Sequence, residues 1–188
     1  MTPGPNMAYL AVLGASHGRL AGFSAVLGVA LGLAILGIAV GLGGGSLLLN
    51  SRVFYESLRW AGALYLCWLA LDSWREARQP IEAVPHNQSS HFTHFRRGLV
   101  TNLLNPKAAL FFIAVLPEFI QGPPSAHELA ILVSIYVGVA TLVHSLIVVL
   151  AGGLQAFFAA PRRREMAGNF FAVLLLAIAV WLFVSGRR

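Results

Sequence analysis

The chain has 188 residues, of which 57% are hydrophobic and only 11% are charged, and its mean hydropathy is +0.75. Soluble domains carry about 25% charged residues, so this composition excludes an ordinary soluble protein and indicates that the lipid bilayer surrounds most of the chain. The formal net charge of +6 does not predict a nucleic-acid partner, because the arginines lie in short clusters between apolar runs and not among exposed aromatic residues.

Apolar runs predict six membrane-spanning helices, because one span takes about 20 apolar residues. In chain order the runs cover residues 1–15, 21–49, 53–74, 98–121, 128–158 and 166–185. In the second run Ala25, Gly28 and Gly32 form a stripe of small residues that favours close helix packing. The third run contains the single cysteine, Cys67, so a disulfide within one chain is excluded. We therefore predict one all-α membrane domain over residues 1–188.

The linkers between these runs differ in charge. The linkers after the first, third and fifth runs carry eight arginines together, whereas the segments on the opposite side of the membrane carry four. By the positive-inside rule the odd-numbered linkers face the cytoplasm and both termini lie outside. The longest linker, residues 76–95, is rich in proline and polar residues and is predicted to be a cytoplasmic loop. It divides the chain into two halves, residues 1–75 and 96–188.

Each half holds three helices, so two similar halves must insert with opposite orientation, the inverted-repeat plan of many secondary transporters. Each half also has a polar motif with a helix-breaking proline: the two motifs are Pro3-Gly4-Pro5-Asn6 and Asn105-Pro106-Lys107. Aligning Pro5 with Pro106 puts Asn6 opposite Lys107. We therefore predict two inverted three-helix repeats in which helices 1 and 4 are broken at proline.

The same alignment shows a difference between the two motifs. Pro106 lies well inside its apolar run, whereas only four residues precede Pro5. Helix 1 therefore lacks its leading half in this sequence. We expect the true start to lie upstream, with about fifteen in-frame apolar codons before Met1, enough for the missing part of a span.

Lys107, the only lysine, lies about 14 Å deep when counted from Gly98 at 1.5 Å per residue, close to the centre of a hydrocarbon core about 30 Å thick. A charge there costs about 2.5–3.5 kcal/mol, so Lys107 should face a polar cavity. Pro106 frees backbone groups, and Asn105 can hydrogen-bond them or a ligand. Such a discontinuous helix is typical of a transporter's binding site.

Lys107 and the dipole of the following helical segment both favour an anion, such as a substrate carboxylate. The alternative is a proline kink with a structurally paired lysine. For the first half, Pro5 and Asn6 belong either to the same site or to an ordinary turn that starts a helix.

Three further features are candidates with weaker support. His144, in the fifth run, could carry a coupled proton near neutral pH, although a lone histidine on a helix is more often a packed core residue. Glu118 either lines an outer vestibule or is an interfacial carboxylate. His86, His91 and His94 suggest a metal site, but no cysteine or carboxylate completes a ligand set, so no metal or cofactor is expected.

Three stretches carry a family resemblance: TPGPN at residues 2–6, RWAGALYLCWLAL at residues 59–71 and GLVTNLLNPKAALFFIAVLPEFI at residues 98–120. With them, nearly the whole chain resembles the LysE/RhtB family of bacterial amino-acid exporters. The resemblance implies a multi-pass carrier in the bacterial inner membrane that exports amino acids or their derivatives, driven by the proton gradient. The motif residues it carries over are Pro3, Gly4, Pro5, Asn6, Asn105, Pro106 and Lys107.

The chain departs from the family in two places, the absent half-helix before residue 2 and Glu118, where the family often has glutamine. The alternative from another class is a non-transporting membrane scaffold or assembly subunit. An intramembrane enzyme is disfavoured, because no paired carboxylates or Ser/His arrangement falls at one depth. The sequence leaves open which amino acid is exported, the coupling ion and whether the protein forms a homo-oligomer.

Overall fold

The computed structural model describes residues 5–78, 91–119, 125–158 and 161–185, and every element in these ranges is helical. The all-α prediction is thus confirmed for the part of the chain that is described, while Pro3 and Gly4 lie outside it. The elements are α1 (Pro5–Ala39), the π-helical turn η1 (Val40–Gly44), α2 (Gly45–Asn50), α3 (Arg52–Ala77), α4 (His91–Leu103), α5 (Pro106–Phe119), α6 (Ala126–Gly152), α7 (Gln155–Phe158) and α8 (Pro161–Ser185).

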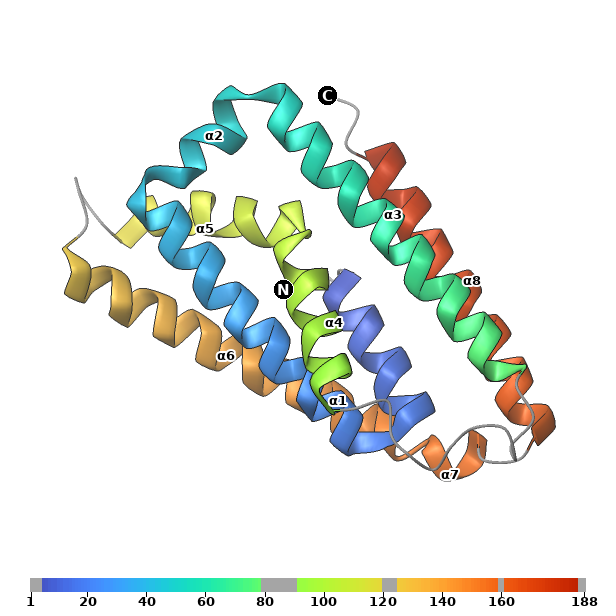
Figure 1. Ribbon diagram of the computed structural model, residues 1–188. Helices are drawn as coiled ribbons and strands as arrows, with labels where there is room; N and C mark the ends of the chain where they lie inside the picture. The colour runs from blue at the N-terminus through green and yellow to red at the C-terminus, as the bar shows by residue number, and fades with distance from the viewer. Residues whose placement is uncertain (1–4, 79–90, 120–124, 159–160, 186–188) are drawn as a thin grey trace.

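Helix α1 consists of two limbs that meet at Gly18. Gly18 has φ 85° and ψ −179°, a conformation that glycine adopts without the steric cost that a Cβ would bring. Figure 1 shows that the chain reverses direction there, so the first limb (residues 5–17) and the second limb (residues 19–39) run antiparallel. The limbs correspond to the first and second predicted runs, and the second continues through η1 and α2.

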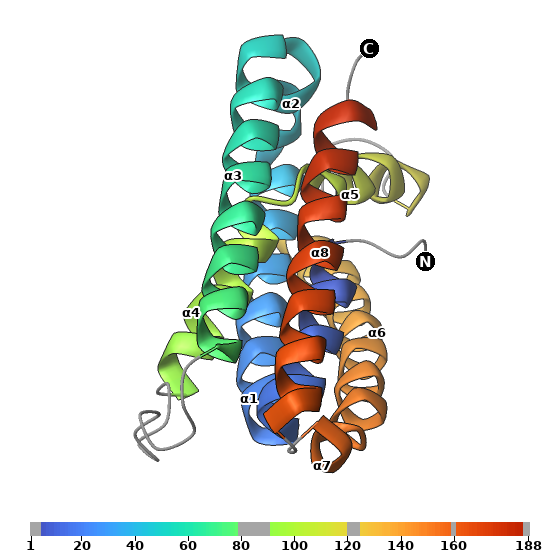
Figure 2. The same cartoon turned by 90° about the vertical axis from the view of Figure 1, so that its right-hand side faces the viewer.

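The helices pack in two groups. Helix α1 packs against α4 and α6, and α3 packs against α8, as Figure 2 shows from the α8 side. The second limb of α1 and α4 approach so closely that a Cβ at Gly28 would overlap the backbone oxygen of Phe95, and one at Gly98 that of Ala25. The prediction that Gly28 serves close packing is therefore confirmed.

The fourth span begins earlier than its apolar run. Helix α4 starts at His91, seven residues before Gly98, because the polar sequence HFTHFRR is amphipathic and buries one face. The buried side of α4 comprises His94, Gly98, Thr101 and Asn102, the i, i+4, i+7, i+8 spacing of a helix stripe. Helix α3 in turn extends to Ala77, so the linker is shorter than residues 76–95.

Helices α4 and α5 form a bent pair, with an angle of 58° between His91–Leu103 and Pro106–Leu116. Two helices are long and apolar enough to cross a membrane: α1 together with η1, and α6. The bent pair can be a third span, and Glu165–Trp181 is a shorter apolar helix. Large apolar side chains such as Ile135, Leu142 and Leu146 point outward from α6 and are exposed. A soluble surface rarely carries so much contiguous apolar area, so these faces belong in the bilayer.

Candidate functional site

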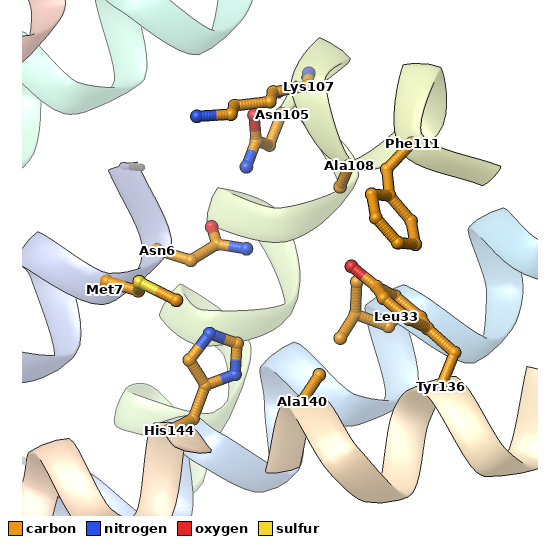
Figure 3. A pocket seen from close by; sticks show the side chains of 10 residues that line it. All are labelled: Asn6, Met7, Leu33, Asn105, Lys107, Ala108, Phe111, Tyr136, Ala140 and His144. Carbon is orange, nitrogen blue, oxygen red and sulfur yellow. Dashed lines mark hydrogen bonds between the residues drawn. The ribbon is translucent and has the colours of Figure 1, made fainter. Parts of the chain in front are cut away.

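A cavity of about 260 Å³ lies where the start of α1 meets the break between α4 and α5. This volume is close to the lower end of small-molecule pockets, about 300–1,000 Å³. Figure 3 shows the side chains that surround it. They come from α1, α5, α6 and the break itself: Asn6, Met7, Leu33, Asn105, Lys107, Ala108, Phe111, Tyr136, Ala140 and His144.

The break follows directly from the local sequence. Pro106 is the first residue of α5, a position that suits proline because the first helical N–H needs no partner within the helix. The side-chain oxygen of Asn105 accepts a hydrogen bond from the backbone N–H of Lys107 at 3.1 Å, which is an N-cap contact. The other end of the amide stays available, and Figure 3 shows the Asn105 nitrogen pointing toward Asn6.

Asn6 joins the two halves of the chain at this point. Its Nδ2 donates a hydrogen bond of 2.5 Å to Oδ1 of Asn102 on α4, and the two side chains are 6% and 0% exposed. The remaining polar atoms, Oδ1 of Asn6 and Nδ2 of Asn102, are buried without a hydrogen-bond partner in the part of the chain that the structure describes. A buried polar group without a hydrogen bond costs about 1–3 kcal/mol. Packing alone therefore does not explain why these two amides are buried here.

Lys107 reaches across from α5 to the last helix. It is half-buried and borders the cavity, while its Nζ lies 5.8 Å from the ring centroid of Trp181 on α8. This is the range of a cation–π contact. Trp181 is thus a partner of the intramembrane charge, a role that its position near the chain end did not predict.

The opposite wall is built from one face of α6. Tyr136, Ala140 and His144 are spaced four residues apart, so they lie on the same side of the helix. The Tyr136 ring stacks on Phe111 with centroids 4.4 Å apart, and Figure 3 shows its hydroxyl pointing into the cavity. Tyr136 lies eight residues before His144, on the same helix face, and this spacing is the signal that would have found it in the sequence.

Some predicted residues lie apart from this cavity. Glu118 is exposed near the end of α5 and is absent from the cavity walls. Pro5 borders a second, much smaller cavity of about 10 Å³, which Asn105 also lines. Among the described residues no group of three His, Cys, Asp or Glu side chains could hold a metal. His94 instead packs edge-on against His17, with ring centroids 5.3 Å apart.

An ion pair that the sequence did not predict links α3 to α4. Arg97 Nη2 lies 2.7 Å from Oδ2 of Asp72, and its guanidinium carbon is 5.2 Å from the Trp68 ring centroid. The pair connects the α3–α8 group of helices to the α1–α4–α6 group.

The model of the family described as "LysE type translocator" matches residues 1–186. The chain belongs to the LysE type translocator family. This confirms the resemblance inferred from the sequence motifs. A translocator is a transport protein and not an enzyme, and the helical architecture with outward apolar faces is that of a multi-pass membrane protein.

Several curated relatives support the family assignment. The homoserine/homoserine lactone efflux protein of Salmonella typhi is 30% identical over 195 residues, which cover the whole of this chain and 91% of the relative. The leucine efflux protein of Enterobacter sp. (strain 638) is 33% identical over 122 residues, 64% of this translocator and 58% of the relative. The threonine efflux protein of Salmonella typhi is 30% identical over 132 residues, 64% and 60% of the two chains. No solved structure matches the translocator.

Proposed function

We propose that this translocator exports an amino acid or a small amino-acid derivative across the bacterial inner membrane, and that the 260 Å³ cavity is its substrate site. One observation carries the proposal. Asn6 from the first half and Asn105 and Lys107 from the second half border the same cavity. Relatives named as efflux proteins for homoserine, leucine and threonine support the substrate class.

The cavity walls match the two ends of an amino acid. Lys107 supplies a positive charge for the carboxylate, and the free end of the Asn105 amide can hydrogen-bond it. On the other side Phe111, Tyr136 and Leu33 offer aromatic and aliphatic surface to a side chain, as Figure 3 illustrates. In this proposal the unpartnered oxygen of Asn6 gains a donor when the cavity is occupied or changes shape.

The helix contacts support an inverted-repeat arrangement of residues 1–75 and 96–188. Pro5 and Pro106 each begin a helix, α1 and α5. In such a repeat the first limb of α1 corresponds to α4, the second limb of α1 to α6, and α3 to α8. Exchanging the two halves therefore turns the contact between α1 and α4 into the contact between α1 and α6, and leaves the contact between α3 and α8 as it is. The two broken helices of the prediction are then the first limb of α1 and the bent pair of α4 and α5, and their polar ends meet at the substrate site.

The arrangement of the turns supports the orientation with the odd-numbered linkers in the cytoplasm. In Figure 1 the reversal at Gly18, the end of α3, the start of α4 and the short helix α7 all lie at one end of the bundle. These are the linkers with the arginine excess, so this end faces the cytoplasm. The other end, with α2, then faces outward, and the same arginine distribution predicts both termini outside.

His144 is the group that we propose for proton coupling. Its side chain is only 6% exposed, yet it borders the cavity beside Ala140. A proton on this imidazole would place a second positive charge opposite Lys107. Substrate binding and protonation of His144 would then affect each other, because both take place in the same cavity.

Counterflow in proteoliposomes tests the proposal. Vesicles loaded with unlabelled homoserine, leucine or threonine should take up the same labelled amino acid faster than vesicles without an internal load, and at least one of the three should do so. Protein-free vesicles provide the baseline. A protein that gives no counterflow with any amino acid of a full panel would be a scaffold or assembly subunit and not a carrier.

A further inference from the structure

A third cavity, of about 580 Å³, lies between α3 and α8, apart from the substrate site. Its walls are small and aliphatic side chains from both helices, such as Ala70, Leu71, Ala172 and Leu176. Leu71 is 42% exposed and Leu176 is 48% exposed. The cavity is therefore an apolar groove on a surface that faces the bilayer.

The groove has the length of one membrane leaflet. Along α3 its lining extends from Cys67 to Arg78, and eleven residues at 1.5 Å each give about 16 Å. Half of a hydrocarbon core about 30 Å thick is nearly the same length. An acyl chain laid along the groove would reach from its deep end to the cytoplasmic end that we assigned from the arginine distribution.

The cytoplasmic end of the groove is positively charged. Arg78 lines it, and its guanidinium carbon lies 4.1 Å from the Trp74 ring centroid. Within the described part of the chain no carboxylate pairs with Arg78. Arg75 lies in the last turn of α3, and Arg163, in the first turn of α8, stacks over Phe157. The positive charge at this end of the groove complements an anionic lipid headgroup.

The groove also contains an unmet hydrogen-bond acceptor. Oδ1 of Asn169 on α8 is buried and has no partner among the described residues, and Asn169 lines the same groove as Arg78. An apolar chain alone would leave both the cation and this acceptor without a partner. A lipid that carries a phosphate and hydroxyl groups can offer partners to both.

We propose that the groove between α3 and α8 binds an anionic phospholipid, with the acyl chain along Leu71 and Leu176 and the phosphate on Arg78. Basic pockets between transmembrane helices on the cytoplasmic side recognise headgroups in this way. The site is separate from the transport cavity, so it does not depend on the identity of the exported substrate. Its occupant joins α3 to α8 on the cytoplasmic side.

Tryptophan quenching tests this proposal, because Trp74 forms part of the groove. A variant that keeps only Trp74, with Trp60, Trp68 and Trp181 replaced by phenylalanine, is placed in phosphatidylcholine vesicles. A fixed fraction of the lipid is either brominated phosphatidylglycerol or brominated phosphatidylcholine. We expect an apparent affinity about fivefold higher for the brominated phosphatidylglycerol, the factor that one arginine close to an anionic headgroup gives.

Matched variants show whether the preference for phosphatidylglycerol arises in the groove and depends on Arg78. A variant that keeps only Trp60, on the same helix but outside the groove, should be quenched equally by both lipids. In the Trp74-only background, Arg78→Gln should remove the preference, whereas Arg52→Gln, at the other end of α3, should keep it. Equal quenching of Trp74 by both lipids, or a preference that Arg78→Gln leaves unchanged, would overturn the proposal.

Discussion

The two prolines that begin α1 and α5 are followed by different polar residues, and these residues lie in different surroundings. After Pro5, Asn6 is buried and bonded to Asn102. After Pro106, Lys107 is half-buried and reaches over Trp181. The first half of the chain thus holds a neutral amide in a fixed position, while the second half places a charge at the cavity wall.

This difference follows from the cost of polar groups in a low-dielectric interior. A neutral amide that makes one good hydrogen bond costs less to bury than an ammonium, so Asn6 can hold α1 and α4 in register. An ammonium cannot be buried so tightly, and needs a cavity or a polarisable partner. We infer that Asn6 fixes the geometry of the site and that Lys107 provides its charge.

The largest expected effect is that of Lys107→Ala. Loss of a charge-assisted contact with a carboxylate, about 1.5–3 kcal/mol, should lower counterflow of the transported amino acid by about 10- to 150-fold. Lys107→Arg keeps the charge and should retain part of the activity, and both variants should insert into the membrane at the normal level. Normal counterflow by Lys107→Ala would show that the lysine is only a packing residue beside a kink.

Asn6→Ala should act first on stability. It leaves the buried Asn102 amide without its partner, which costs about 1–3 kcal/mol, and the apparent melting temperature in detergent should fall, unlike that of Lys107→Ala. Because Asn102→Ala removes the other partner, the double variant should lose less than the sum of the single losses. Strictly additive losses would mean that the two amides do not interact.

A smaller effect is expected from Tyr136→Phe, which removes the hydroxyl that points into the cavity and keeps the ring that stacks on Phe111. One neutral hydrogen bond is worth about 0.5–1.5 kcal/mol, so the KM for transport should rise about 2- to 12-fold. The maximal rate should stay close to normal. An unchanged KM across the amino-acid panel would remove Tyr136 from the substrate site.

The smallest effect should come from Trp181→Phe. Phenylalanine keeps the apolar contact but offers a weaker face to the ammonium, and an exposed cation–π contact is worth about 0.5–1 kcal/mol. Counterflow should change by about twofold, whereas Trp60→Phe should leave it unchanged, because Trp60 lies on α3 and lines none of the three cavities. A Trp181→Phe loss as large as that of Lys107→Ala would make Trp181 part of the binding site.

Local sequence signals predicted the all-α class and pointed to several local features of the fold. The cost of a lysine and a proline inside an apolar run indicated a break at Asn105, and α4 ends and α5 begins on either side of it. Gly18 separates the two limbs of α1 because the apolar runs are interrupted there. The small residues of the second run indicated the close contact between α1 and α4.

Other features depend on which helix faces meet, and the sequence does not encode these locally. Asn102 and Tyr136 each look like a lone polar residue on an apolar helix until α1, α4, α5 and α6 are packed together. The start of α4 at His91 was missed because its first turns are amphipathic and not apolar. The contact of Trp181 with Lys107 was not predicted, because the two residues are distant in sequence.

The most direct test asks whether one substrate protects both halves of the cavity. In a Cys67→Ser background, Met7→Cys reports on the first half and Ala108→Cys on the second, and both positions line the cavity. We predict that the amino acid that gives counterflow slows thiol modification of both cysteines with the same half-maximal concentration. Protection of only one cysteine, or of the two at different concentrations, would contradict a single site shared by the two halves.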